Sequence, residues 1–242
     1  MLNLEILKLK FNLEVKNIVH VGAHNGKEVE TYNKLFGNSE IHLFEPNKSS
    51  FKKLKIKFND KKNIYLYNFA LGNDNDEKLL NVSSDFPNTS SILKPGLHKV
   101  YYPEVIFDDT EVVNVRTFDS LSIKDVNFMA IDTQGYELEV LKGSNENLNF
   151  IDYLIVEVNR KYLYKDAPLE KEIDSFLRPF GFIRLVTSYW GKECVWGDGF
   201  YVKKNKLSQR LILKTLIKNI LYKSMLIYKT VRFIKNFVKR IN

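Results

Sequence analysis

Short apolar runs that alternate with helical patterns constrain the fold of this chain more than any other feature of its sequence. Seven runs have the length and composition of buried strands, at residues 17–22, 40–45, 63–70, 126–132, 152–157, 182–186 and 199–203. Helical patterns lie at residues 27–36, 48–58, 136–142 and 168–177. This alternation predicts an α/β fold with a mostly parallel seven-stranded sheet and helices on both faces. The last two strands, joined through residues 190–198, are expected to form an antiparallel edge hairpin.

The composition is that of a globular protein with one large domain or two small ones. Of the 242 residues, 44% are hydrophobic and 27% are charged, which excludes wholly disordered and collagen-like chains. The single cysteine, Cys194, excludes an internal disulfide framework and a cysteine-cluster zinc site. We find no run of ~18 apolar residues that would span a membrane, and the first residues lack a secretory-signal pattern. We therefore expect a cytoplasmic location.

Residues 73–118 interrupt the alternation of strands and helices. Turn-forming residues gather in this segment at 85–92, 94–96 and 101–103. A long, turn-rich insertion in a compact domain is more often functional than idle. We expect it to form a lid or a wall beside a ligand crevice.

A ligand crevice is predicted where the first two strands end. Gly22 and Gly26 flank a strand-to-helix junction, where glycine lets a ligand approach the backbone and the helix offers free N–H groups. The junction lacks the three-glycine dinucleotide fingerprint. Glu45, before Pro46, lies 23 residues after Gly22, a position from which an acid can accept hydrogen bonds from ribose hydroxyls. The alternatives are that the two glycines only form a turn into a helix and that Glu45 is an exposed loop carboxylate.

Four segments in this order resemble the FkbM family of S-adenosylmethionine-dependent methyltransferases. They are VGAHNGKE (21–28), LFEPN (43–47), NFALGN (68–73) and IDTQGYELEVLKG (131–143). The fourth segment is the most specific, and the resemblance extends over roughly residues 17–203. It implies a Rossmann-like class I methyltransferase fold, S-adenosylmethionine as methyl donor, and O-methylation of sugars, glycans or natural products.

The resemblance also implies which residues contact the cofactor. Its methionine and ribose end would contact Gly22, Ala23, Asn25 and Gly26, and its ribose would contact Glu45 and Pro46. Its adenine would lie near Asn68, Ala70 and Leu71. Asp132 would contact the methionine end or the acceptor. The family usually carries Asp where this chain has His20. This histidine either hydrogen-bonds to the cofactor or only packs in the strand.

Four residues are candidates for accepting the proton of the acceptor or for positioning it. They are Asp132, Glu137, Glu157 and His98. Asp132 and Glu157 end neighbouring strands, and the histidine of the insertion has a suitable intrinsic pKa. Glu137 begins a helix, where the helix dipole favours a carboxylate without any catalytic role. The spacing of these residues does not require a metal ion, and none is predicted.

The positive charge is concentrated at the carboxyl end of the chain. Residues 203–242 hold 12 of the 37 Lys and Arg and no Asp or Glu, so residues 1–202 hold 25 basic and 29 acidic residues. We predict a methyltransferase domain over 1–204 and a basic amphipathic helical tail over 205–242. On a helix, residues 207–242 would place a basic face opposite an apolar face, which suits an anionic membrane surface. Packing on the domain or on a second subunit, and a grip on nucleic acid, are the alternatives.

The leading hypothesis is an O-methyltransferase that acts on a hydroxyl of a glycan, a glycolipid or another sugar-containing precursor. The tail would hold it at the inner face of the plasma membrane, near its acceptor. A membrane-associated scaffold with a degenerate cofactor pocket is a second hypothesis, because His20 replaces the acid of the family. A nucleic-acid methyltransferase is a third, and a homo-oligomer is left open.

Overall fold

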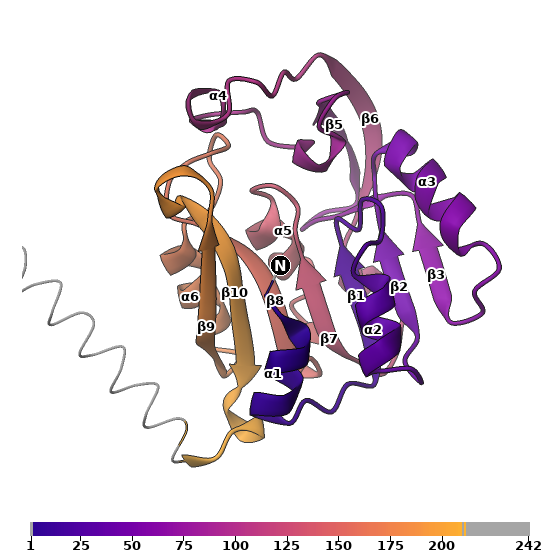
Figure 1. Cartoon of the computed structure of the whole chain (residues 1–242), viewed down its shortest axis with the longest axis vertical. Helices are drawn as coiled ribbons and strands as arrows, with labels where there is room; N and C mark the ends of the chain where they lie inside the picture. Colours follow the sequence, from indigo (N-terminus) through magenta and orange to yellow (C-terminus); the bar gives the residue numbers. More distant parts are fainter. Residues whose placement is uncertain (1, 210, 212–242) are drawn as a thin grey trace, which may run out of the picture. The chain divides into compact units, whose positions relative to one another are not determined.

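The computed structural model describes residues 2–209 and 211 of the chain (Figure 1). The chain divides into two compact units, Met1–Lys203 and Lys204–Asn242. The helices of the first unit are α1 (Leu4–Phe11), α2 (Val29–Leu35), α3 (Lys48–Phe58), α4 (His98–Tyr101), α5 (Glu137–Lys142) and α6 (Glu170–Leu177). Its strands are β1 (Asn17–Val21), β2 (Ile41–Phe44), β3 (Ile64–Tyr67), β4 (Ala70–Leu71), β5 (Asp76–Val82), β6 (Asp109–Arg116), β7 (Val126–Ile131), β8 (Tyr153–Asn159), β9 (Phe182–Trp190) and β10 (Trp196–Lys203). Most of the predicted tail lies outside the described residues.

The main sheet has seven strands in the order β3-β2-β1-β7-β8-β10-β9. Neighbours from β3 to β8 run parallel, and β10 pairs antiparallel with both β8 and β9. The predicted α/β fold and the antiparallel hairpin are therefore confirmed. The hairpin strands are longer than expected, and they meet in a turn at Gly191, whose φ is 72°.

Helices cover both faces of this sheet, and adjacent side chains of a strand divide between them. Phe128 of β7 lies against Phe36, just after α2, while Phe200 of β10 lies against Phe11 of α1. Their neighbours Met129 and Tyr201 belong to the opposite core, which α5 and α6 cover. Figure 1 shows α1 and α2 in front of the sheet and α5 and α6 behind it. Because both faces are covered, β7 and β8 are buried along their whole length.

The insertion supplies two strands of a second sheet that the sequence patterns did not predict, and the third strand, β4, directly precedes it. The three strands have the order β4-β6-β5, with β5 and β6 antiparallel. The predicted strand 63–70 is split accordingly: β3 ends at Tyr67, and Ala70–Leu71 pairs with β6 instead. Asn68 lies at the break, and its side-chain amide donates to the carbonyls of Glu45 and Pro46 at 2.9 and 3.1 Å. This turn carries the chain from one sheet to the other.

Helix α1 is also absent from the predicted elements. Asn3 caps it by accepting a hydrogen bond from the backbone N–H of Ile6 at 3.0 Å. Only Leu4 and Leu7 of this short helix are buried, so its apolar pattern is too brief to be read from sequence. Helix α1 packs on the sheet beside β10.

Candidate active site

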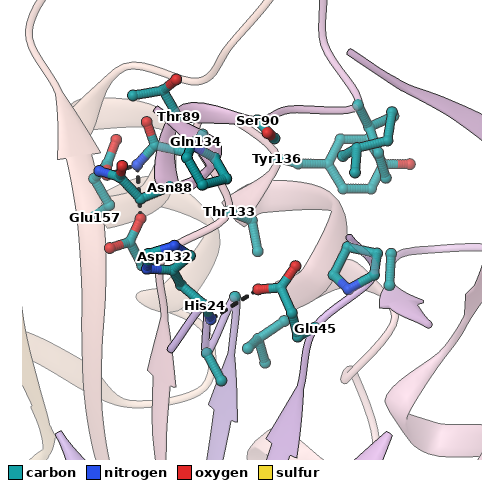
Figure 2. Close-up of a pocket in the computed structure, with 18 of the residues that line it drawn as sticks. His24, Glu45, Asn88, Thr89, Ser90, Asp132, Thr133, Gln134, Tyr136 and Glu157 are labelled. Atoms are coloured by element: carbon teal, nitrogen blue, oxygen red, sulfur yellow. Dashed lines mark hydrogen bonds between the residues drawn. The ribbon is translucent and has the colours of Figure 1, made fainter. Parts of the chain in front are cut away.

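A cavity of about 400 Å³ lies at the carboxyl ends of β1, β2, β7 and β8. Parallel strands bring these ends to one edge of the sheet, where α/β proteins bind their ligands. The insertion supplies the facing wall through residues 86–90 and 92 and through His98, Tyr102, Glu104 and Val105. Part of the insertion thus forms the expected wall, while none of residues 106–118 lines the cavity. Figure 2 shows part of the lining.

The turn after β1 is fixed by a close approach of backbone to backbone. Gly22 has a φ of 79°, and a Cβ at this position would lie 1.8 Å from the carbonyl oxygen of Asp132. Only glycine fits there. The turn continues through Ala23, His24 and Asn25, all of which line the cavity. Gly26 does not line it and instead packs against Phe58 of α3.

Glu45 is a buried carboxyl group held by two backbone donors. The N–H of His24 donates to Oε2 at 2.7 Å (Figure 2). The N–H of Asn47 donates to Oε1 at 2.8 Å. The side chain lines the cavity, and burial raises the pKa of Glu45 to about 7. A carboxylate has about four acceptor sites, so further hydrogen bonds can form on the cavity side.

An apolar wall adjoins this carboxyl group. It consists of Pro46, Phe69, Ala70, Leu71 and Tyr136. Phe69 was not among the predicted contacts. Asn68 was among the predicted contacts, but it does not line the cavity. Its side chain instead donates to the backbone of Glu45 and Pro46 and so holds their loop.

A second group of carboxyls lies at the ends of β7 and β8. Asp132 and Glu157 both line the cavity, and the side-chain amide of Gln134 donates to both, at 2.8 Å each (Figure 2). Burial, with the neighbouring charge of Asp132 second, raises the pKa of Glu157 well above its ordinary value. Gln134 was not named as a site residue from the sequence, although it belongs to the IDTQGYELEVLKG segment.

Glu137 lies outside the cavity lining and faces the loop before its own helix. Its Oε1 accepts hydrogen bonds from the backbone of Thr133 and Gly135 and from the hydroxyl of Thr133, at 3.0 to 3.1 Å. The side chain is fully buried, and burial raises the pKa of Glu137 to about 7. Glu137 therefore stabilises the loop at residues 133–135 and does not face the cavity.

Two histidines of the lining are buried and neutral. His98 of α4 packs against the rings of Tyr102, Phe107 and Tyr164, and its Nδ1 has no hydrogen-bond partner among the described residues. His20 of β1 lies with Nδ1 3.1 Å from the hydroxyl of Tyr32. Burial lowers the pKa of both His20 and His98. His20 therefore packs in its strand and also lines the cavity, where an aspartate would bring a negative charge.

The structure thus brings most of the predicted site residues to one cavity. Those that line it are Gly22, Ala23, Asn25, Glu45, Pro46, Ala70, Leu71, His98, Asp132 and Glu157. Those outside its lining are Gly26, Asn68 and Glu137. Within residues 2–209 and 211, no cluster of three or more His, Cys, Asp or Glu is arranged to hold a metal ion. The same part of the chain holds no helix long and apolar enough to cross a membrane.

Comparison with known proteins identifies the family. Residues 20–184 match the model of the methyltransferase FkbM domain. The 2-O-methyltransferase NoeI of Sinorhizobium fredii (strain NBRC 101917 / NGR234) is 21% identical over 168 residues, which cover 65% of this chain and 69% of that protein. The crystal structure of the methyltransferase FkbM from Methylobacillus flagellatus KT superposes with a TM-score of 0.51 and 15% identity, over 78% of this chain and 43% of that one. The chain belongs to the FkbM family of S-adenosylmethionine-dependent methyltransferases.

Proposed function

We propose that this enzyme transfers a methyl group from S-adenosylmethionine to a hydroxyl of a glycan, a glycolipid or another sugar-containing precursor. One observation carries the proposal: the same cavity is lined by Glu45 at one end and by the carboxyl pair, Asp132 and Glu157, at the other. The name of the relative NoeI, a 2-O-methyltransferase, supports oxygen as the methylated atom.

The residues at the Glu45 end fit the nucleoside half of the cofactor. The acceptor sites that the backbone leaves on Glu45 can bind two ribose hydroxyls. The apolar side chains of Phe69, Ala70 and Leu71 provide a surface for the adenine ring. The methionine half would be held by Gly22, Ala23 and Asn25. The turn after β1 packs on α3 at Gly26, and Asn68 stabilises the loop that carries Glu45.

The residues at the carboxyl-pair end fit the chemistry of an acceptor hydroxyl. When bound, the cofactor supplies a methyl group on a positively charged sulfur; its transfer breaks the sulfur–carbon bond, forms an oxygen–carbon bond and releases the hydroxyl proton. Asp132 and Glu157 would orient that hydroxyl and take the proton. Neutral His98, across the cavity on the insertion, is the second candidate for that proton.

The charge of the lining supports an uncharged acceptor. Among the described residues that line the cavity, carboxyl side chains outnumber those of Lys and Arg by six to one. Sugar hydroxyls can donate to carboxylates, and the rings of Tyr102 and Trp196 add apolar faces against which a sugar ring can pack. A polyanion such as RNA would be repelled by this lining, so nucleic acid is the weaker choice of acceptor.

A transfer assay with tritiated methyl donor tests the proposal. The purified protein is offered neutral oligosaccharides, a glycolipid extract and RNA, and the products are checked by mass spectrometry. We expect label on sugar hydroxyls, loss of label with Asp132→Asn, and full transfer with Glu77→Gln, an exposed carboxylate outside this cavity. Label on RNA with none on the sugars would contradict the proposed acceptor.

We further propose that residues 207–242 hold the enzyme on an anionic membrane. The proposal rests on the sequence alone, which places basic residues and no acidic ones across this segment. In a sedimentation assay the full chain should pellet with vesicles containing phosphatidylglycerol and stay in solution with phosphatidylcholine vesicles, since the attraction is electrostatic. A chain shortened to residue 206 that still pellets with the anionic vesicles would refute the proposal.

A further inference from the structure

Gln134 has a backbone conformation that its residue type seldom adopts. Its φ is 55°, in the left-handed region, which costs a residue with a Cβ roughly 1–2 kcal/mol. Such a conformation persists only where the surroundings hold it in place. The contacts of Gln134 show what holds it and what it holds in turn.

The amide nitrogen of Gln134 joins two carboxyl groups from different strands. It donates to Oδ1 of Asp132, at the end of β7, and to Oε2 of Glu157, on β8, both at 2.8 Å (Figure 2). An amide has two N–H bonds, so each carboxyl group can receive one. The hydrogen bonds therefore fix the two side chains relative to each other at the edge of the cavity.

The two oxygens of Gln134 connect to the wall segment, residues 83–92 of the insertion, one directly and one through Tyr164. The hydroxyl of Ser91 donates to the carbonyl oxygen of Gln134 at 2.7 Å. The hydroxyl of Tyr164, fully buried, lies 3.0 Å from the Oε1 of Gln134 and 2.7 Å from the carbonyl oxygen of Thr89. The wall segment and the carboxyl pair are thus linked through one side chain.

We propose that Gln134 is a positioning residue for methyl transfer, which holds the carboxyl groups of Asp132 and Glu157 beside the acceptor position and ties them to the wall segment. The inference rests on the proposed function, because the carboxyl pair is placed at the reacting end of the cavity there.

The electrostatics of the pair explain why such a residue is needed. Burial raises the pKa of Glu157, and the facing carboxyls of Asp132, Glu137 and Asp198 raise it further. Donors from Gln134 favour the ionised form of a carboxyl. The amide therefore opposes the rise in the pKa of Glu157 that burial and the neighbouring carboxyls cause.

The experiment measures the titration of Glu157 by ¹³C NMR of the side-chain carboxyls in the full chain, with Glu157→Gln assigning the signal. Two variants remove the amide: Gln134→Met keeps the volume, and Gln134→Gly suits the positive φ and guards against misfolding. The matched control is Gln209→Met, the same change at an exposed position.

Loss of a hydrogen bond to a charged group should raise the pKa of Glu157 by about one to two units in both variants. The Gln209→Met titration should match that of the wild type. A Glu157 titration that does not move in a folded Gln134→Gly protein would overturn the inference. This readout needs no acceptor. A shifted titration combined with failed sugar methylation would therefore support the positioning role of Gln134 and reject the proposed acceptor.

With an acceptor in hand, the pH profile of kcat gives a second test. The acidic limb of the profile should move upward in Gln134→Gly by the shift that the NMR titration gives, because the ionised carboxyl is then reached only at higher pH. An unchanged limb together with a lower kcat would mark a structural role and contradict the inference.

Discussion

The substitution Glu45→Gln should stabilise the cofactor-free protein at high pH while it weakens cofactor binding. Burial raises the pKa of Glu45 from 4.5 to about 7. The folded state therefore binds a proton that the unfolded state releases, and this stabilisation is present below about pH 4.5 and lost as the pH rises through about 7. Once ionised, the buried carboxylate costs about 3 kcal/mol relative to its neutral form.

A glutamine cannot ionise, but it has only one oxygen for the two backbone donors of His24 and Asn47. The lost hydrogen bond costs about 1 kcal/mol. The net gain is then about 2 kcal/mol at pH 8 and close to zero at pH 5. The other buried carboxyls titrate in both proteins and cancel in the comparison.

Urea unfolding of wild type, Glu45→Gln and the control Glu77→Gln at pH 5 and pH 8, without cofactor, measures this difference. A free-energy change for Glu45→Gln that is the same at both pH values would refute the reasoning. So would a loss of stability at pH 8.

Four further substitutions test the backbone turns and the buried polar contacts of the fold. Gly22→Ala should cost more than about 3 kcal/mol or prevent folding, because its Cβ would meet a backbone oxygen; Gly181→Ala, with a φ of 83° and nothing within 4 Å, should cost only roughly 1–2 kcal/mol by thermal unfolding. Equal losses would contradict this account. Tyr32→Phe should cost about 1–3 kcal/mol, since it leaves the buried Nδ1 of His20 unpaired; no loss of urea stability would show that the hydroxyl is idle. Arg184→Met should cost about 2–4 kcal/mol, because Glu170 and Asp174 of α6 lose their cationic partner and keep only tyrosine hydroxyls; an unchanged free energy of unfolding in urea would refute it.

The strand ends of the site could be predicted because few arrangements satisfy the sequence. Short apolar runs bounded by turn signals favour strands, and parallel strands bring their carboxyl ends to one edge. Gly22, Glu45, Asp132 and Glu157 each follow or end such a run. Their meeting in one cavity follows from the order of the strands.

The loops could not be predicted in the same way, because distant contacts decide them. The position of the Gln134 side chain depends on hydrogen bonds with Glu157 and Tyr164, which lie more than twenty residues away along the chain. Glu137 was expected near the acceptor from its place after strand β7, but its carboxyl turns back to accept three donors from the preceding loop. No local pattern distinguishes these two directions for the side chain.

The second sheet escaped prediction for a related reason. Strand β5 has charged or exposed side chains along most of its length, and only Leu80 and Val82 are buried. Pairing with β6 and packing of three side chains, Leu80, Val82 and Val113, make it a strand. In sequence its apolar pattern is too weak to stand out from a turn-rich loop.

Calorimetric titration with S-adenosylmethionine tests the central claim most directly. Saturable binding to the wild type is expected, unchanged in Glu77→Gln and weakened at least about tenfold in Glu45→Gln, since charged hydrogen bonds to the ribose are lost. Equal affinity in folded Glu45→Gln, or no binding by the folded wild type, would contradict the account.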